Sequence, residues 1–235
     1  MSFKTFMFDD IGNVSIYKNK KSRSLKLSIK SDGQLRLTMP VWVPYSTGVN
    51  FIQKNKKWIS EHKLSPQKAL SDQQKIGKEH RIIFIDSDSK VVRSLVKDNY
   101  ITIYVPNNMS IDSELVQDTA IKASKKALKK ESSTLIPLRV NELAKIYGFS
   151  FNNIRVRSLK GRWGSCSQKK DLTFNIFLMQ LPQHLIDYVI IHELVHTKHM
   201  NHGPAFWDEF GKHLENPKEI KKEMKNYSPI ISIAD

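Results

Sequence analysis

The chain has 235 residues, of which 40% are hydrophobic and 26% charged, a balance that is typical of globular proteins and excludes a disordered chain. Its apolar runs are shorter than the roughly 18 residues of a membrane-spanning helix, and Asp9 and Asp10 interrupt the place where a signal peptide has its apolar core. We therefore expect a cytoplasmic protein with no membrane association, and the single cysteine, Cys166, fits that reducing compartment.

The first hundred residues predict a β-rich domain with one helix. Residues 14–39 alternate as strands do, and Ser31–Gly33 is typical of a hairpin turn. A helical pattern begins at Ser46 and continues to Ile59. Three further strands are predicted in 82–85, 91–96 and 100–105, with a turn at 97–99. No internal repeat is evident in the sequence, and we place this first domain at residues 1–108.

Residues 109–235 predict a second, mainly helical domain with a small sheet, so the fold class is α+β. A long helix is expected over 110–147, ending at Gly148, with Pro137 kinking or dividing it. Strands are predicted around 154–159 and 172–178, on either side of a glycine-containing connection. Pro182, Pro204 and Pro217 are each placed to begin a helix.

Four of the eight histidines lie between His192 and His202. His192, Glu193 and His196 form the pattern HExxH, in which two imidazoles four residues apart share one helical face and can bind one ion. Glu193 lies about 100° around the helix, outside the coordination sphere but within reach of a water beside the ion. Because unpaired imidazoles are costly near a buried apolar run such as 186–191, we predict a metal site with Glu193 as the catalytic base.

A catalytic zinc ion usually has three protein ligands, and two residues could supply the third. His199 shares the helical face of His192 and His196, but imidazoles on consecutive turns, about 5.4 Å apart, converge poorly on one ion. His202 approaches from another direction if the helix ends near Asn201, as the following Gly203–Pro204 suggests. We predict Zn²⁺ held by His192, His196 and His202, with His199 as the alternative.

The spacing of these residues equals the metzincin signature, but His199 replaces the metzincin glycine and no Met-turn is evident. A closer resemblance is to the YgjP-like metallopeptidases, predicted zinc hydrolases related to the SprT-like and WLM proteases. It rests on WGSCS at 163–167, on the linked run from Asn175 through HExxH to Trp207, and on the β segment in 15–63.

The resemblance implies a zincin-like, gluzincin-like catalytic domain in which a small sheet lies over the HExxH helix. It implies hydrolysis of protein or peptide substrates, and it assigns zinc binding and acid/base catalysis to the same four residues, His192, Glu193, His196 and His202. Phe206 and Trp207 are expected to pack behind His202, and Cys166 to be a buried structural thiol. The strand around 172–177 is either core or an edge that pairs with substrate.

Three alternatives stay open. A non-peptidase zinc hydrolase would use the same ion and base. A nucleic-acid-binding module with structural zinc would favour four closed, cysteine-rich ligands, which a chain with one cysteine does not offer. The net charge of +15, with basic patches in 18–36, 122–130 and 151–170, keeps nucleic acid as a partner and allows a protease that acts on DNA-bound proteins. His184 and His213 have no evident partner.

Overall fold

The computed structural model describes residues 3–29, 35–62 and 69–231, and the chain divides into two compact units, Met1–Lys68 and Ala69–Asp235. Each unit has its own hydrophobic core. None of the helices in the described part of the chain combines the length and hydrophobicity that a membrane-spanning helix requires. The chain is therefore a mixed α+β protein with several small sheets and helices.

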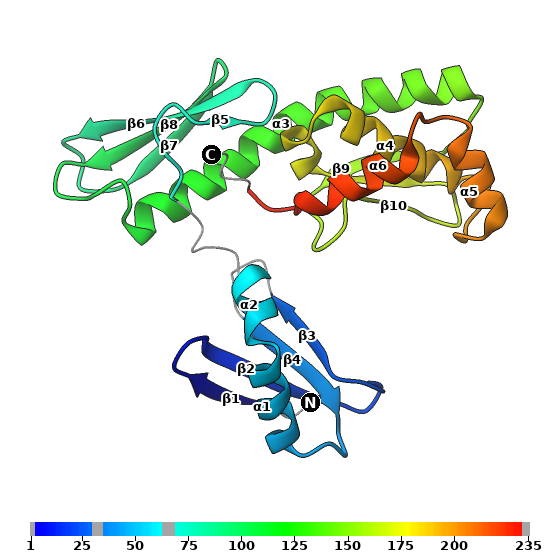
Figure 1. Cartoon of the computed structure of the whole chain (residues 1–235). Coiled ribbons are helices and arrows are strands. Elements are labelled where there is room, and N and C mark those ends of the chain that lie inside the picture. The colour runs from blue at the N-terminus through cyan, green and yellow to red at the C-terminus, as the bar shows by residue number, and fades with distance from the viewer. Residues whose placement is uncertain (1–2, 30–34, 63–68, 232–235) are drawn as a thin grey trace. The chain divides into compact units, whose positions relative to one another are not determined.

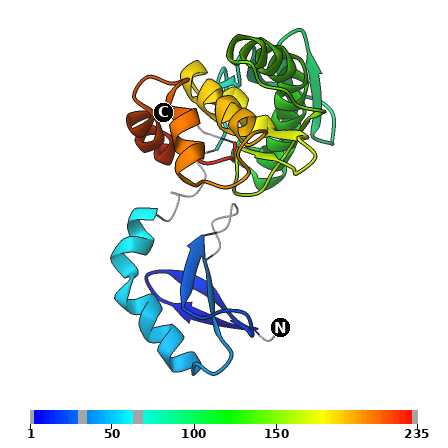
Figure 2. The same cartoon turned by 90° about the vertical axis from the view of Figure 1, so that its right-hand side faces the viewer.

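The first unit is a four-stranded sheet with two helices along one face (Figures 1 and 2). The strand order is β1-β2-β4-β3, with β2 and β4 parallel and the two outer pairs antiparallel. The elements are β1 (Phe3–Phe8), β2 (Gly12–Asn19), β3 (Lys26–Ile29), β4 (Leu35–Pro40), α1 (Tyr45–Lys54) and α2 (Lys56–His62). The predicted turn at Ser31–Gly33 lies outside the described residues.

Helix α1 packs closely on one face of this sheet. Gly48 lies so near the strands that an added Cβ would come within 3.0 Å of Met39 Sδ and 3.1 Å of Leu37 Cδ2. Ile16 and Ile52 are fully buried between the helix and the sheet. Among residues 3–29 and 35–62, no helix lies on the opposite face of the sheet.

The second unit begins with a sheet that repeats the strand order of the first. Its order is β5-β6-β8-β7, and again the central pair is parallel and the outer pairs are antiparallel. Asp98 and Asn99 both have positive φ, as the tight turn between β7 and β8 requires, which confirms the predicted turn. The strands are β5 (Lys75–Ile76), β6 (His80–Ser87), β7 (Arg93–Lys97) and β8 (Tyr100–Pro106).

Helix α3 (Glu114–Tyr147) runs the length of the second unit (Figure 1). It contacts β7 and β8 and also β9 (Ile154–Arg157) and α4 (Gln183–Val195), so that one core extends from Leu70 to Ile231. The sheet of β5 to β8 therefore belongs to the same unit as the HExxH helix, whereas the sequence placed a boundary near residue 108. The helix ends at Gly148 with φ 67° as predicted, but Pro137 does not divide it.

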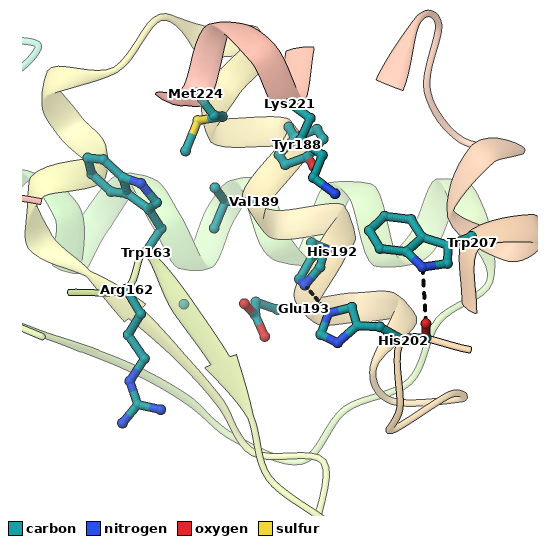
Figure 3. Close-up of a pocket in the computed structure, with 11 residues that line it drawn as sticks. Arg162, Trp163, Tyr188, Val189, His192, Glu193, His202, Trp207, Lys221 and Met224 are labelled. Carbon is teal, nitrogen blue, oxygen red and sulfur yellow. Dashed lines mark hydrogen bonds between the residues drawn. The ribbon is translucent and has the colours of Figure 1, made fainter. Parts of the chain in front are cut away.

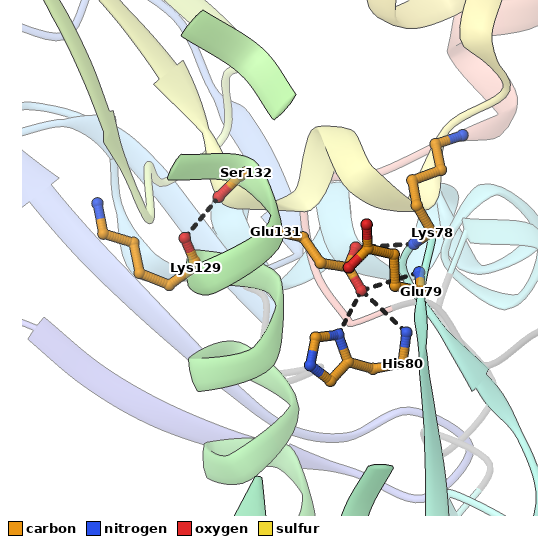
Figure 4. Close-up of polar contacts among 6 residues, drawn as sticks. All are labelled: Lys78, Glu79, His80, Lys129, Glu131 and Ser132. Carbon is orange, nitrogen blue, oxygen red and sulfur yellow. Dashed lines mark hydrogen bonds and ion pairs between the residues drawn. The ribbon is translucent and has the colours of Figure 1, made fainter. Parts of the chain in front are cut away.

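A buried carboxylate ties the start of the second unit to α3 (Figure 4). Glu131 accepts hydrogen bonds from the backbone N–H groups of Lys78, Glu79 and His80, at 2.7 to 3.0 Å, and lies 2.6 Å from His80 Nδ1. A Cβ added at Gly77, whose φ is +75°, would lie 2.4 Å from Glu131 Oε2. Position 77 needs glycine because of its positive φ and because a side chain would collide with Glu131. The hydrogen bonds to Glu131 fix β5 and β6 on α3.

In the described residues, a three-stranded sheet and five short helices, two of them 3₁₀ helices, complete the second unit. The sheet order is β10-β11-β9, so β11 is central and hydrogen-bonded on both sides, and all four of its residues are buried. The segment around 172–177 is thus core and not an edge strand. The elements are β9 (Ile154–Arg157), β10 (Gly164–Cys166), β11 (Leu172–Asn175), the 3₁₀ helices η1 (Ile176–Gln180) and η2 (Met224–Asn226), and α4 (Gln183–Val195), α5 (Pro204–Gly211) and α6 (Pro217–Glu223).

Candidate metal centre and its pocket

Helix α4 carries the first part of the HExxH pattern and ends sooner than expected. Its last helical residue is Val195, and His196 follows as the C-cap with helical φ and ψ of −61° and −19°. The turn then tightens, because Thr197 N–H donates to Leu194 O and Lys198 N–H to Val195 O, both at 3.0 Å. His196 keeps its helical position, while the chain after it leaves the helix axis.

Three imidazoles meet at this helix end. One ring nitrogen of each of His192, His196 and His202 lies within 4.8 Å of the others, and His192 Nε2 is 3.0 Å from His202 Nε2. His202 comes from the loop before α5, and its ring lies next to that of His192 (Figure 3). His199 is not part of the cluster. Its carbonyl accepts the Nδ1–H of His196 at 3.0 Å, which leaves His196 Nε2 free to bind an ion.

The aromatic residues of α5 hold the three rings in place. Phe206 is fully buried, and its ring centroid lies 4.6 to 4.9 Å from those of all three imidazoles. Trp207 Nε1 donates to His202 O at 3.1 Å. The predicted packing of Phe206 and Trp207 behind His202 is therefore confirmed, and the ring of Phe206 supports the helical pair as well.

The protonation of the cluster favours a cation. Burial, together with His196 and His202, lowers the pKa of His192 to about 3, and burial also lowers the pKa of His196. Both are therefore neutral near pH 7, the form that offers a lone pair to a metal. Nitrogens bound tetrahedrally to zinc at about 2.0–2.1 Å are about 3.3 Å apart, close to the 3.0 Å between the two Nε2 atoms. The residues fit a metal ion.

Glu193 lies beside the imidazoles, with its carboxylate pointing into a pocket (Figure 3). Its exposed fraction is 6%, and burial raises its pKa to about 8, an effect that the charge of Arg162 partly offsets. Gly164 of β10 packs directly on it, since an added Cβ would lie 2.7 Å from both Glu193 Cγ and Oε1. The missing side chain at Gly164 makes room for the carboxylate.

The pocket has a volume of about 480 Å³ and extends from the metal-binding residues toward the preceding turn of α4. One side of the pocket is apolar. Its cationic lining residues are Arg162 and Lys221, and Glu193 is its only carboxylate. Lys221 of α6 lies over the ring of Trp207, 4.8 Å from its centroid. The other side chains of the wall are Arg162, Trp163, Tyr188, Val189 and Met224.

Asn175 organises the loop that forms this wall, a role that the sequence did not suggest. Its side chain is fully buried, and its amide nitrogen donates to Leu159 O at 2.9 Å and to Arg162 O at 2.8 Å. Its backbone N–H donates to Trp163 O at 2.8 Å. Trp163 and Gly164 are thereby held against α4. The only early signal was that Asn175 belongs to the stretch that carries the family resemblance.

Three other residues singled out in the sequence lie away from the cluster. Cys166 is half-buried, and burial, with Glu193 and Asp171 nearby, raises the pKa of its thiol to about 11, so it is not a reactive thiolate. His184 and His213 do have partners. His184 Nε2 lies 2.7 Å from Glu223 Oε2, and His213 packs on Tyr147 and Phe149.

Comparisons with known proteins find one family and a few similar structures. The family described as "YgjP-like, metallopeptidase domain" matches residues 23–227. The metallopeptidase zymogen jannalysin of Methanocaldococcus jannaschii is 28% identical over 37% of this chain and 90% of its own, with a TM-score of 0.34. The zymogen abylysin of Pyrococcus abyssi is 29% identical over the same shares, with a TM-score of 0.33. No curated protein matches the chain.

Proposed function

Because the chain belongs to the YgjP-like metallopeptidase family, whose members are metal-dependent hydrolases of protein or peptide substrates, we propose that it is a zinc peptidase with Glu193 as its general base. The observation that carries this proposal is the convergence of three imidazole nitrogens within 4.8 Å beside a buried carboxylate in a pocket. An all-imidazole set of three ligands suits Zn²⁺ and leaves a position open for catalysis.

In this proposal His192, His196 and His202 hold the ion, and His199 positions His196 through its carbonyl. When bound, zinc acts as a Lewis acid that polarises the scissile carbonyl and makes a water molecule acidic enough to attack near neutral pH. The positive charge of a bound ion would lower the raised pKa of Glu193, so that the ionised carboxylate could take the proton from the attacking water and pass it to the nitrogen of the leaving amine. The arrangement is zincin-like, and specifically gluzincin-like, with a small sheet beside the metal-binding helix.

The substrate backbone is proposed to pair with β10 rather than with the strand around 172–177. Strand β10 is at the edge of its sheet, and it contacts α4 through Gly164, next to Glu193. An extended peptide can add to such an edge through main-chain hydrogen bonds. This would bring the scissile bond past the catalytic carboxylate.

The pocket indicates which type of substrate side chain is preferred next to the scissile bond. Its apolar wall, formed by Trp163, Val189 and Met224 among others, suits a large apolar residue. Lys221 and Arg162 at the rim oppose a basic residue and favour an acidic one. We expect faster cleavage of peptides with large apolar or acidic residues at this position than of those with lysine.

The proposal is tested by measuring zinc content and casein cleavage on matched variants. Glu193→Gln should keep one zinc ion and lose about a hundredfold to ten-thousandfold in kcat/KM, because it removes the proton acceptor but no ligand. His202→Ala should lose zinc, whereas His199→Ala should keep it, because only its carbonyl takes part. A Glu193→Gln protein that cleaves at the rate of the unaltered protein would refute the assignment, as would zinc loss in His199→Ala alone.

A further inference from the structure

Each of the two four-stranded sheets has a face that no helix of its own unit covers, and aromatic rings lie on both. On the first sheet, the strand pairing places Phe3, Tyr17 and Lys26 in one row. The Phe3 and Tyr17 rings stack with centroids 5.0 Å apart, and Arg36 Cζ lies 4.0 Å from the Tyr17 centroid. The contacts of Phe3, Tyr17 and Arg36 join β1, β2 and β4, on the side of the sheet opposite α1.

The second sheet has an equivalent face, because it repeats the strand order of the first. Its α3 side holds the fully buried Ile82, Ile101 and Ile103. On the other side, Tyr100 pairs with Arg81 and Lys97, and Tyr104 pairs with Ile85 and Arg93. Tyr100 and Leu95 on this side are nearly half exposed and belong to neither core.

The charges on these two faces have one sign. Among the described strand residues that project from them, every charged side chain is a cation: Lys26, Arg36, Lys75, Arg81, Arg93 and Lys97. In sequence terms, residues 1–68 hold thirteen lysines and arginines against four acidic residues. A polyanion is the complementary partner.

We propose that these two faces bind single-stranded nucleic acid. Aromatic rings on an open sheet stack with unpaired bases, and the neighbouring lysines and arginines bind the phosphates. A duplex keeps its bases stacked inside, so it offers the rings nothing to stack on and would meet only the cations. Neither face contributes a residue to the imidazole cluster or its pocket, and binding there would hold the peptidase beside proteins on the same nucleic acid.

The test is fluorescence anisotropy of the full chain with a labelled single-stranded oligothymidylate, titrated at several salt concentrations. A duplex of the same length, heparin and polyglutamate serve as competitors. We expect the single strand to bind more tightly than all three, with an affinity that falls as salt rises.

Variants separate stacking from net charge. Phe3→Ala combined with Tyr100→Ala should weaken binding by about tenfold or more, because each exposed ring contributes to base stacking. The matched control is Trp42→Ala, an aromatic residue that is 68% exposed in the loop after β4. Lys26→Glu and Arg93→Glu should weaken binding more than Lys57→Glu and Lys125→Glu, the same kind of change on the helices.

Three results would overturn the proposal. One is the absence of binding at low salt. Another is equal competition by duplex, heparin or polyglutamate, which would indicate attraction to any polyanion or to an acidic protein. The third is an equal effect of the face variants and their controls, with circular dichroism showing that all of them are folded.

Discussion

At the scale of single residues, the placement of Glu193 depends on the absence of a side chain at Gly164. Glu193 is buried against Gly164, and no other residue type leaves space for the carboxylate at that contact. The glycine would therefore position the proposed general base without touching substrate. Asn175 acts indirectly. Its hydrogen bonds to Arg162 and Trp163 fix the loop that holds Gly164 against α4.

Gly164→Ala tests this positioning role. The new Cβ would lie 2.7 Å from Glu193 Oε1, so the carboxylate must shift, and a displacement of about 1 Å can lower kcat/KM by about a hundredfold. Zinc content should not change, because no imidazole is involved. Gly211→Ala is the control, since an added Cβ there meets nothing within 4 Å. Unaltered cleavage by Gly164→Ala would show that the contact does not position Glu193.

Residue types and spacing predicted which imidazoles lie together better than they predicted which residues pack around them. His192, Glu193 and His196 share a helical turn, so local geometry alone places them together, and Gly203–Pro204 made an approach from His202 the better choice. The roles of Gly164 and Asn175 depend on contacts with residues far along the chain, and no local pattern reports such contacts. The identity of the ion and of its ligands stays a prediction.

At the scale of elements, the loop after α4 is held by α5. Glu209 of α5 accepts from Lys198 Nζ at 2.9 Å and from Lys212 Nζ at 3.0 Å. Lys198 lies in the turn that follows His196. The ion pair therefore joins the end of the metal-binding helix to the helix that carries Phe206 and Trp207.

This ion pair predicts how stability depends on pH. The hydrogen bonds from Lys198 and Lys212 lower the pKa of Glu209 from 4.5 to about 2. A carboxyl whose pKa is lower in the folded chain stabilises the fold above its unfolded pKa, and that contribution is lost as the pH falls from 4.5 toward about 2. In urea titrations, Glu209→Gln should therefore lose less free energy of unfolding than the unaltered chain over that interval. Glu215→Gln, at an exposed position, should follow the unaltered chain, and parallel curves for all three would contradict the assignment.

Most elements were predictable because their signals are local. The turn at Asp98–Asn99, the end of α3 at Gly148 and the helices that begin near Pro204 and Pro217 all depend on a few adjacent residues. Pro137 was expected to kink or divide its helix, and α3 continues through it without division because both of its halves are packed into the same core. The end of α4 also differed, since its tightened last turn follows from tertiary packing around His196.

At the scale of the whole molecule, the amino-acid composition changes near residue 108, but no boundary between compact units lies there. The change marks the passage from strands to a helix inside one unit, and α3 then covers the strands that precede it. The division at 68 and 69 follows a short polar segment, which is a weaker signal in the sequence. The repeated strand order could not be predicted from the sequence either, since two sheets can share an order of strands without recognisable sequence similarity.

The division predicts that residues 69–235 fold alone and bind one zinc ion. All of the core from Leu70 to Ile231 and all three imidazoles lie within them. Thermal unfolding followed by circular dichroism should show a cooperative transition. The control is residues 109–235, which should not unfold cooperatively, because they leave the buried face of α3 without its sheet. Cooperative folding of that shorter chain, or failure of the longer one, would contradict the division.

The ring of Phe206 connects the cluster of three imidazoles to helix α5. Phe206 lies against all three imidazoles, and its own helix has only eight residues, too few to be stable without such contacts. Hydrogen–deuterium exchange should therefore slow across 204–211 when zinc is added and quicken when a chelator removes it, while amides in the middle of α3 stay unchanged. Helix α5 would then serve as a built-in reporter of whether the peptidase is loaded.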